Sequence, residues 1–169
     1  MKRRWLLLIL VAAGAWSSAA LLGGPGGQKD AGKKGEKPAA PAAMKFIAAD
    51  DAPKAIGPYS QAVVEGGFLF AAGQISLDPK TGELVGGTIE QSADRVFDNL
   101  EAVLKAAGLT FADIVKTTVY LTKAEDFAAL NGVYARRMGD HKPARSTVIV
   151  AALPRNAPME IELIARAGR

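Results

Sequence analysis

The pattern of residues 114–150 predicts a strand, a helix and a second strand, an order that fixes how the two strands can be connected. Ile114–Leu121 is rich in β-branched residues and predicts a buried strand. Residues 125–138 carry apolar side chains at helical spacing and end at Gly139, and Arg145–Val150 predicts the next strand. Two strands joined through a helix lie parallel in one sheet, with a right-handed crossover. The chain therefore needs a sheet with a helix packed on it.

The remaining pattern extends this unit to a larger α+β sheet. Further strands are predicted at 45–48, 59–65, 68–72 and 159–165, with Gly66-Gly67 as the turn of a hairpin. Thr88 and Gln91 form a capping box for a second helix, which Gly108 ends. We predict a mixed sheet with both helices on one face. The other face stays uncovered, and apolar residues on it would favour oligomerisation.

The first 43 residues differ in composition from the rest. Met1-Lys-Arg-Arg precedes the apolar run Trp5–Trp16 and the small residues Ser17–Ala20, which is typical of a secretory signal peptide. A retained membrane anchor is the alternative for residues 1–22, and either one places the body outside the cytoplasm, secreted or periplasmic. Residues 23–43 are a flexible Gly/Pro/Ala/Lys linker. Residues 44–169 form one domain.

Charge and composition exclude several function classes for the body. Seven basic and two acidic residues lie in the first 43 positions, which leaves 14 basic and 15 acidic residues for the domain. A domain of net charge −1 offers no basic surface, so we expect no nucleic-acid partner. The chain has no cysteine and one histidine, His141, and no phosphate-binding loop, so we expect neither a metal site nor a nucleotide cofactor.

Arg145 is the most unusual residue of the body because it begins an apolar strand. Burying a guanidinium costs free energy unless it meets a carboxylate. Arg145 therefore pairs inside the chain, with Glu160 or Glu162 as the partner, or it binds an acidic ligand. From the residues alone, the internal salt bridge is the favoured interpretation.

The segments around Arg145 resemble a known family. Pro143-Ala-Arg-Ser, the apolar run to Leu153 and Met159-Glu-Ile are similar to the signature of the RidA (YjgF) family of reactive-intermediate, or imine, deaminases. Supporting segments follow in the family's order over residues 44–169: Ala55-Ile-Gly-Pro-Tyr-Ser-Gln, Ala72-Gly-Gln-Ile, Pro79-Lys-Thr-Gly-Glu, Ala106-Ala-Gly-Leu and Asp113-Ile-Val-Lys-Thr-Thr-Val. The leader lies outside the resemblance.

The resemblance implies a fold, an assembly and a reaction. It implies a chorismate-mutase-like α+β fold in a homotrimer, with a central β-barrel and active sites in the clefts between subunits. The implied activity is that of a 2-iminobutanoate/2-iminopropanoate deaminase, which hydrolyses enamines and 2-imino acids to 2-oxo acids and ammonia without a cofactor. A membrane is a partner only if the N-terminal segment is retained.

The resemblance also assigns the central residues of the cleft. Arg145 would hold the substrate carboxylate in a bidentate fork, which orients the C=N carbon. Glu160 and the backbone around Thr147 would position a water and receive protons, and Tyr59 would border the cleft. Glu160 is equally well explained as a structural partner of Arg145, and Tyr59 as an interface aromatic. Glu162 shares the sheet face of Glu160 and is a weaker candidate.

Further positions line the expected cleft, and two depart from the family pattern. Gly73 and Gln74 would form the opposite wall, and Asn131 lies at a helix position associated with the pocket, although a plain polar surface role suits Asn131 better. Ala72 stands where active members often carry Ser, which removes one hydrogen bond to substrate. Thr147 stands where many carry Cys, which costs little.

Two other functions remain open at this stage. The first is a non-catalytic trimer that binds small carboxylates without turning them over. The second is a holdase or ribonuclease activity, which the near-neutral domain and the export signal disfavour.

Overall fold

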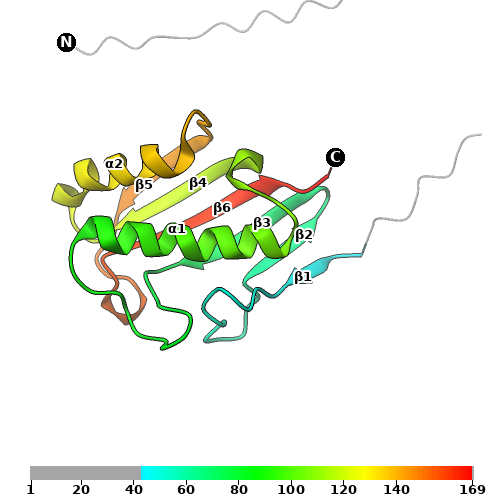
Figure 1. The fold of residues 1–169 in the computed structure, drawn as a ribbon, viewed down its shortest axis with the longest axis horizontal. Helices are drawn as coiled ribbons and strands as arrows, with labels where there is room; N and C mark the ends of the chain where they lie inside the picture. The colour runs from blue at the N-terminus through cyan, green and yellow to red at the C-terminus, as the bar shows by residue number, and fades with distance from the viewer. Residues whose placement is uncertain (1–42, 169) are drawn as a thin grey trace, which may run out of the picture. The chain divides into compact units, whose positions relative to one another are not determined.

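The computed structural model describes residues 43–168, which form one six-stranded mixed sheet with two helices in front of it (Figure 1). The strand order is β1-β2-β3-β6-β4-β5. The strands are β1 Lys45–Ile47, β2 Ala62–Glu65, β3 Phe68–Gln74, β4 Ile114–Leu121, β5 Ala144–Ile149 and β6 Met159–Arg166, and the helices are α1 Ile89–Ala106 and α2 Phe127–Met138. The predicted α+β fold with both helices on one face is confirmed.

The pairing of β4 with β5 is parallel, and every other pair in the sheet is antiparallel. Thr117 lies opposite Arg145 in the parallel pair, and Tyr120 lies opposite Glu160 in the pairing of β4 with β6. The strand–helix–strand unit predicted from residues 114–150 is therefore present. Because β4 lies between β5 and β6, it separates the strand that carries Arg145 from the strand that carries Glu160.

Helix α1 begins where the capping box predicts it. The Gln91 backbone N–H donates to the Thr88 hydroxyl, and the Thr88 backbone N–H donates to the Gln91 side chain, which satisfies two of the free amides of the first turn. One face of α1 is buried on the sheet, with Val96, Phe97 and Leu100 at 0, 0 and 1% exposure. This face and the inward side chains of β3, β4 and β6 make the main core.

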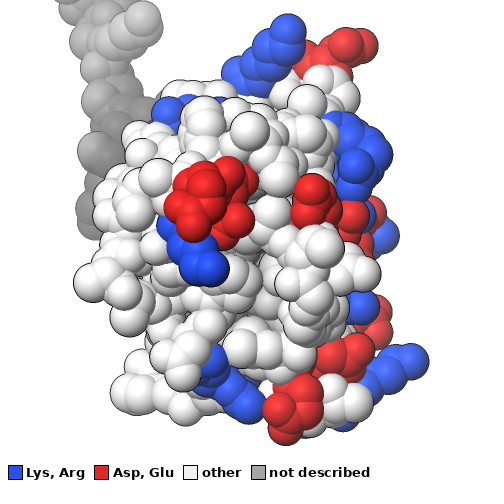
Figure 2. All heavy atoms as spheres, turned by 90° about the vertical axis from the view of Figure 1, so that its left-hand side faces the viewer, with Lys and Arg blue, Asp and Glu red and all other residues white. Residues whose placement is uncertain are grey.

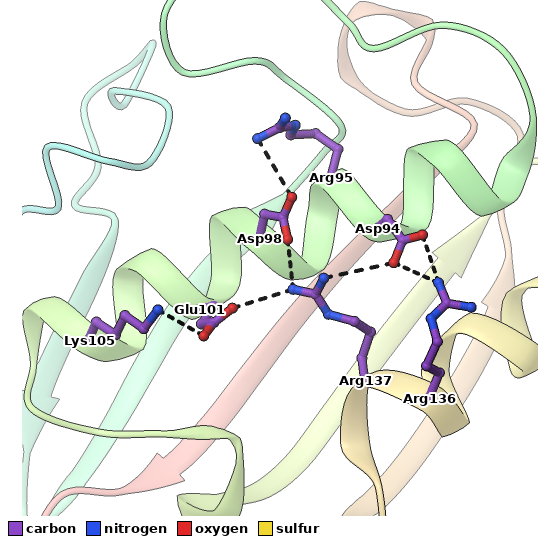
Figure 3. Close-up of polar contacts among 7 residues, drawn as sticks. All are labelled: Asp94, Arg95, Asp98, Glu101, Lys105, Arg136 and Arg137. Atoms are coloured by element: carbon purple, nitrogen blue, oxygen red, sulfur yellow. Dashed lines mark hydrogen bonds and ion pairs between the residues drawn. The ribbon is translucent and has the colours of Figure 1, made fainter.

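Ion pairs hold α2 beside α1 (Figure 3). Arg137 donates to Asp98 at 2.7 Å and to Glu101 at 3.4 Å, while Arg136 donates to both oxygens of Asp94 at 2.8 and 2.7 Å. The Arg137 guanidinium also lies 5.8 Å from the ring centroid of Phe97. Exposed pairs contribute little singly, but Arg137 is only 21% exposed and joins three acidic groups, so this network fixes α2 above β4 and β5.

The sheet face away from the helices is uncovered within residues 43–168. Phe46, Phe68, Phe70 and Val148 on this face are 65, 40, 47 and 43% exposed. Figure 2, seen from the left of Figure 1, shows charged side chains gathered on the helix side, at the right, whereas the described part of the opposite side is largely uncharged. An exposed apolar sheet face of this kind fits a surface that another protein chain covers.

Several predicted boundaries are wrong, including the end of the strand predicted over 68–72, which extends to Gln74. The strand predicted over 59–65 begins only at Ala62, because Pro58 lacks a donor and the Gln61 side chain bonds to the loop before it, at Ala49 N (2.6 Å) and Pro53 O (2.8 Å). The helix predicted from 125 begins at Phe127, after a 3-10 turn at Ala124–Asp126.

The signal peptide or anchor over 1–22 and the linker lie outside the described residues, apart from Ala43. No helix among the described residues is long and apolar enough to cross a membrane.

Candidate active site

The first half of the candidate site is a pocket beside Glu160 at one end of the sheet. It is lined by Pro53, Lys54, Ala55, Ile56, Tyr59, Gln61, Ala72, Gly73, Gln74, Ile75, Leu77, Pro154 and Glu160. The pocket thus gathers Tyr59, Ala72, Gly73, Gln74 and Glu160 of the predicted site. Ile56 and Tyr59, at 63 and 50% exposure, give it an apolar rim.

A β-bulge in β3 brings the backbone close to Glu160. Ala71 pairs with Leu163 and Gln74 with Ile161, so β3 has one more residue than β6 between these pairs. A Cβ placed on Gly73 would overlap the Glu160 carboxylate. The backbone of Gly73 does not lie in the left-handed region, so an unusual φ is not the reason for a glycine here. The reason is the close approach of the Glu160 side chain.

Burial and a like charge act on Glu160. Desolvation raises the pKa of the half-buried Glu160 carboxyl, and the charge of Glu162, two residues along the same face, raises it further. The Tyr120 hydroxyl donates to Glu162 Oε1 at 3.2 Å, and desolvation and the Glu162 charge raise the pKa of the Tyr120 phenol. Glu160 consequently keeps its proton to higher pH than an ordinary glutamate, which suits a group that gives and takes protons.

Glu162→Gln should move the alkaline limb of the pH profile, on which Glu160 loses its proton. The substitution removes one cause of the raised Glu160 pKa and leaves burial in place, so the pKa of Glu160 falls toward its usual range. The limb of the kcat/KM profile that Glu160 controls then shifts to lower pH. Measuring the profile beside Glu65→Gln, a carboxyl at the far end of β2, provides the control. An unchanged limb in Glu162→Gln would contradict this coupling.

Gly73→Ala should impair the site without unfolding the chain. The new methyl group displaces the Glu160 carboxylate, and a displacement of about 1 Å at a reacting group costs roughly 100-fold in rate. Gly86→Ala is the matched control because open space surrounds that position and its φ is not positive. Steady-state kinetics and thermal melts of both variants test the prediction. Native activity in Gly73→Ala would show that the position of Glu160 is unimportant.

The second half of the candidate site lies around Arg145 on the helix side of the sheet. A pocket there is lined by Asn131, Tyr134, Ala135, Met138, Gly139, His141, Lys142, Pro143 and Arg145. The Arg145 guanidinium carbon is 4.5 Å from the ring centroid of Tyr134 and 5.8 Å from that of Phe127. Asn131 of α2 thus lines the same pocket as Arg145, as its sequence position suggests.

The two halves lie on opposite faces of the sheet. Thr117, opposite Arg145, faces α2, whereas Glu160 lies between the buried residues Met159 and Ile161 and so faces away from the helices. Thr147, two residues after Arg145, shares the Arg145 face. The Arg145 and Glu160 Cα atoms are separated by two strand intervals across the sheet and by the distance from Thr117 to Tyr120 along it. From these spacings they are roughly 14 Å apart. One chain therefore does not bring Arg145 and Glu160 together.

This geometry overturns the internal salt bridge. Within residues 43–168, no ion pair links the Arg145 guanidinium to a carboxylate, and Arg145 is exposed at the edge strand. The cost of burying Arg145, on which the salt-bridge interpretation rested, does not arise because β5 is an edge strand and not a central one. Glu160 and Glu162 share one face of the sheet, as predicted, and it is the face opposite to that of Arg145.

Sequence reasoning missed the two tyrosines that support these groups. Tyr134 lies in the helix predicted over 125–138 and Tyr120 in the strand predicted over 114–121, and the sequence assigned neither a role in the site. Neither has a local signal, because the contact of Tyr134 with Arg145 and that of Tyr120 with Glu162 join different elements. Within the described chain, no cluster of three or more His, Cys, Asp or Glu residues could hold a metal ion.

The fold and the two half-sites define the class to which the chain belongs: a single-sheet α+β domain with a cationic pocket on one face and a carboxyl pocket on the other. The family described as Endoribonuclease L-PSP matches residues 49–167. The chain belongs to this family, which is the RidA (YjgF) family. The resemblance stated from the motifs is thereby confirmed at the level of the family.

The alignment with this domain covers almost the whole length of the relatives described here. A RutC family protein of Pyrococcus horikoshii is 52% identical over 121 residues, which is 72% of this chain and 96% of the relative. The 2-iminobutanoate/2-iminopropanoate deaminase of Mus musculus is 45% identical over 124 residues, which is 73% of this chain and 92% of the mouse protein.

Solved structures agree with the fold. YyfA of the Rid protein family from Yersinia pestis is 46% identical, with a TM-score of 0.72 over 73% of this chain and 99% of that one. E. coli TdcF, solved with bound serine, is 42% identical, with a TM-score of 0.69 over 72% of this chain and 98% of that one.

Proposed function

We propose that the chain hydrolyses 2-imino acids and their enamine tautomers to 2-oxo acids and ammonia, as a 2-iminobutanoate/2-iminopropanoate deaminase. The observation that carries the proposal is the pair of half-sites: a guanidinium without a carboxylate partner among the described residues, and a carboxyl with a raised pKa. The mouse relative is named for this activity, and the E. coli relative was solved with an amino acid bound.

In the proposed reaction, Arg145 binds the substrate carboxylate through two parallel N–H donors and so fixes the C=N carbon. Protonated Glu160 donates its proton to the imine nitrogen, which makes the carbon electrophilic. A water oxygen forms a bond to this carbon, and the Glu160 carboxylate accepts the proton that the water releases. Glu160 then donates this proton to the amino nitrogen of the resulting amino alcohol, ammonia leaves as the C–N bond breaks and the C=O bond forms, and the Glu160 carboxylate accepts the hydroxyl proton. The sum is imino acid and water to oxo acid and ammonia.

We further propose that the chain acts as a homotrimer in which each cleft combines the Arg145 pocket of one subunit with the Glu160 pocket of its neighbour. The positions of Arg145 and Glu160 on opposite faces support this, because the two groups meet only when a second copy supplies one of them. The exposed Phe68 and Phe70 on the uncovered face supply apolar area for such an interface. Closed symmetry would then give equal clefts.

Mixing two inactive variants tests this assembly. Arg145→Ala and Glu160→Gln are each expected to be inactive, but a mixed trimer contains clefts in which both groups are native. Random exchange at equal amounts gives native clefts at about one quarter of the sites, so activity should rise to that level after the variants are unfolded and refolded together. Refolding each variant alone is the control. No recovery, with mixed trimers demonstrated by mass spectrometry, would contradict the shared cleft.

The activity itself is tested by ammonia release from enamines that a serine or threonine dehydratase generates in the assay. The purified full chain should accelerate the release above the rate in buffer. Arg145-dependent binding of 2-oxobutyrate without any acceleration would instead identify a non-catalytic carboxylate-binding trimer, for which Ala72, without the family's hydroxyl, would be the reason.

We propose a secreted or periplasmic location for the domain, on the basis of the basic and apolar N-terminal segment. Fractionation of the native host, with detection of the domain and its N-terminal residue by mass spectrometry, tests this location. Recovery of the domain in the cytoplasmic fraction, with the N-terminal segment intact, would contradict it.

A further inference from the structure

Among the described residues, the Arg145 guanidinium contacts an aromatic ring and pairs with no carboxylate. Its central carbon lies 4.5 Å from the Tyr134 ring centroid, well inside the distance of about 6 Å at which a cation is attracted to a ring face. Phe127, at 5.8 Å, is at the edge of this range and is itself 42% exposed. Tyr134 is therefore the main contact of the guanidinium.

Tyr134 is fixed on every side that does not face Arg145. Its hydroxyl is hydrogen-bonded to Thr117 Oγ1 at 2.8 Å, and Thr117 is fully buried. Phe97 of α1 meets its ring edge-on, with centroids 5.6 Å apart and planes at 75°. Only 8% of Tyr134 is exposed. A ring held in this way has one position, so it provides a rigid surface for a long and flexible side chain.

The guanidinium contacts a ring and a carboxylate through different parts of the group. A ring attracts a guanidinium through the flat face of the cation, whereas the five N–H donors lie in the plane of the cation. A guanidinium that lies flat on a ring therefore keeps its in-plane fork free for a carboxylate. Holding the fork still before binding also removes the loss of side-chain entropy that ordering an arginine would otherwise cost at the moment of binding.

We propose that Tyr134 is a positioning residue that holds the Arg145 guanidinium ready for a small carboxylate. The proposal rests on the function proposed above, because it names how the anchor of that site is oriented. Tyr134 itself touches no substrate atom in this proposal. Its contribution is to affinity for the acid end of the ligand, and the proton transfers at Glu160 do not depend on it.

Two substitutions separate the ring from the hydroxyl. Tyr134→Phe and Tyr134→Leu both remove the hydrogen bond to Thr117, but only Tyr134→Leu removes the ring face under Arg145. Calorimetry on the full-length protein with 2-oxobutyrate should give an affinity for Tyr134→Phe within about twofold of native. Tyr134→Leu should bind roughly 3- to 10-fold more weakly. The neutral amide of 2-oxobutyrate should bind equally to both variants.

A second measurement does not depend on the ligand. The Arg145 Nε–H signal, assigned by its loss in Arg145→Lys, should report an ordered side chain in native protein and in Tyr134→Phe by the proton–nitrogen Overhauser effect. It should report a mobile side chain in Tyr134→Leu. In turnover, Tyr134→Leu should raise KM by the same factor as the dissociation constant and leave kcat within about twofold, which general destabilisation would not produce.

The outcomes distinguish the two proposals. If Tyr134→Leu binds 2-oxobutyrate like native protein while Arg145→Ala does not, the role of Tyr134 is overturned and the anchor role of Arg145 stands. If Arg145→Ala also binds normally, the anchor in the proposed function is wrong as well. Should Tyr134→Leu fail to fold, an Arg145 side chain that is already mobile in native protein or in Tyr134→Phe overturns the proposal, and an ordered one in both supports it.

Discussion

Arg145→Ala is expected to lower kcat/KM for 2-imino acids by about 30- to 5,000-fold. Removing one partner of a hydrogen-bonded charge pair in a desolvated cleft costs about 2–5 kcal/mol. The fold should persist, because Arg145 is exposed on an edge strand and bonds to no carboxylate within residues 43–168. Steady-state kinetics give the loss, and a thermal melt gives the stability.

Arg166→Ala and Arg145→Lys serve as controls for this variant. Arg166 is an exposed arginine at the end of β6, so its loss should leave kcat/KM unchanged. Arg145→Lys keeps the charge but loses the planar fork, and it should therefore recover only part of the rate. Activity close to native in Arg145→Ala would remove the carboxylate anchor from the proposed mechanism.

Glu160→Gln is expected to lower kcat by about 100- to 10,000-fold, which is the range for losing a positioned acid and base. The amide has nearly the same shape as the acid but cannot transfer a proton. Substrate affinity should change little, because Arg145 supplies the anchor from the other half-site. The measurement is kcat and KM over pH 5–9, with Glu65→Gln as the control. A kcat within tenfold of native would assign the proton transfers elsewhere.

The same substitution should not destabilise the fold at neutral pH. The pKa of Glu160 is raised in the folded chain, so the folded state binds its proton more tightly than the unfolded state. The ionised carboxyl therefore opposes folding as pH rises above the ordinary value, and this opposition disappears at lower pH. Glu160→Gln removes it. Unfolding midpoints at pH 5 and pH 8 should differ less in the variant than in the native protein.

The parts of the fold that depend on local patterns were predictable. The capping box at Thr88 and Gln91 is a contact within one turn, and the strand–helix–strand unit follows from periodicity and the short connections within 114–150. The start of β2 was mispredicted because Gln61 bonds to a loop twelve residues earlier. Such a bond has no periodic signal.

The candidate site was only partly readable for a related reason. Motif resemblance located Arg145, Glu160 and Gly73, but it did not show on which face of the sheet each residue lies. The face of each residue depends on sheet register: Arg145 pairs with Thr117 and Glu160 with Tyr120, and these two β4 residues point to opposite faces of the sheet. Tyr134 was invisible because its role requires Thr117, Phe97 and Arg145 from three other elements.

In the proposed homotrimer, the separation of Arg145 and Glu160 on two faces makes catalysis depend on protein concentration. A lone chain holds both groups but no complete cleft, so below the dissociation constant of the assembly the specific activity falls with dilution. Ligand that bridges two subunits strengthens their association in the same measure. Substrate supply would thus regulate how many complete clefts exist. The number of active sites would depend on the concentrations of protein and substrate and not on the sequence alone.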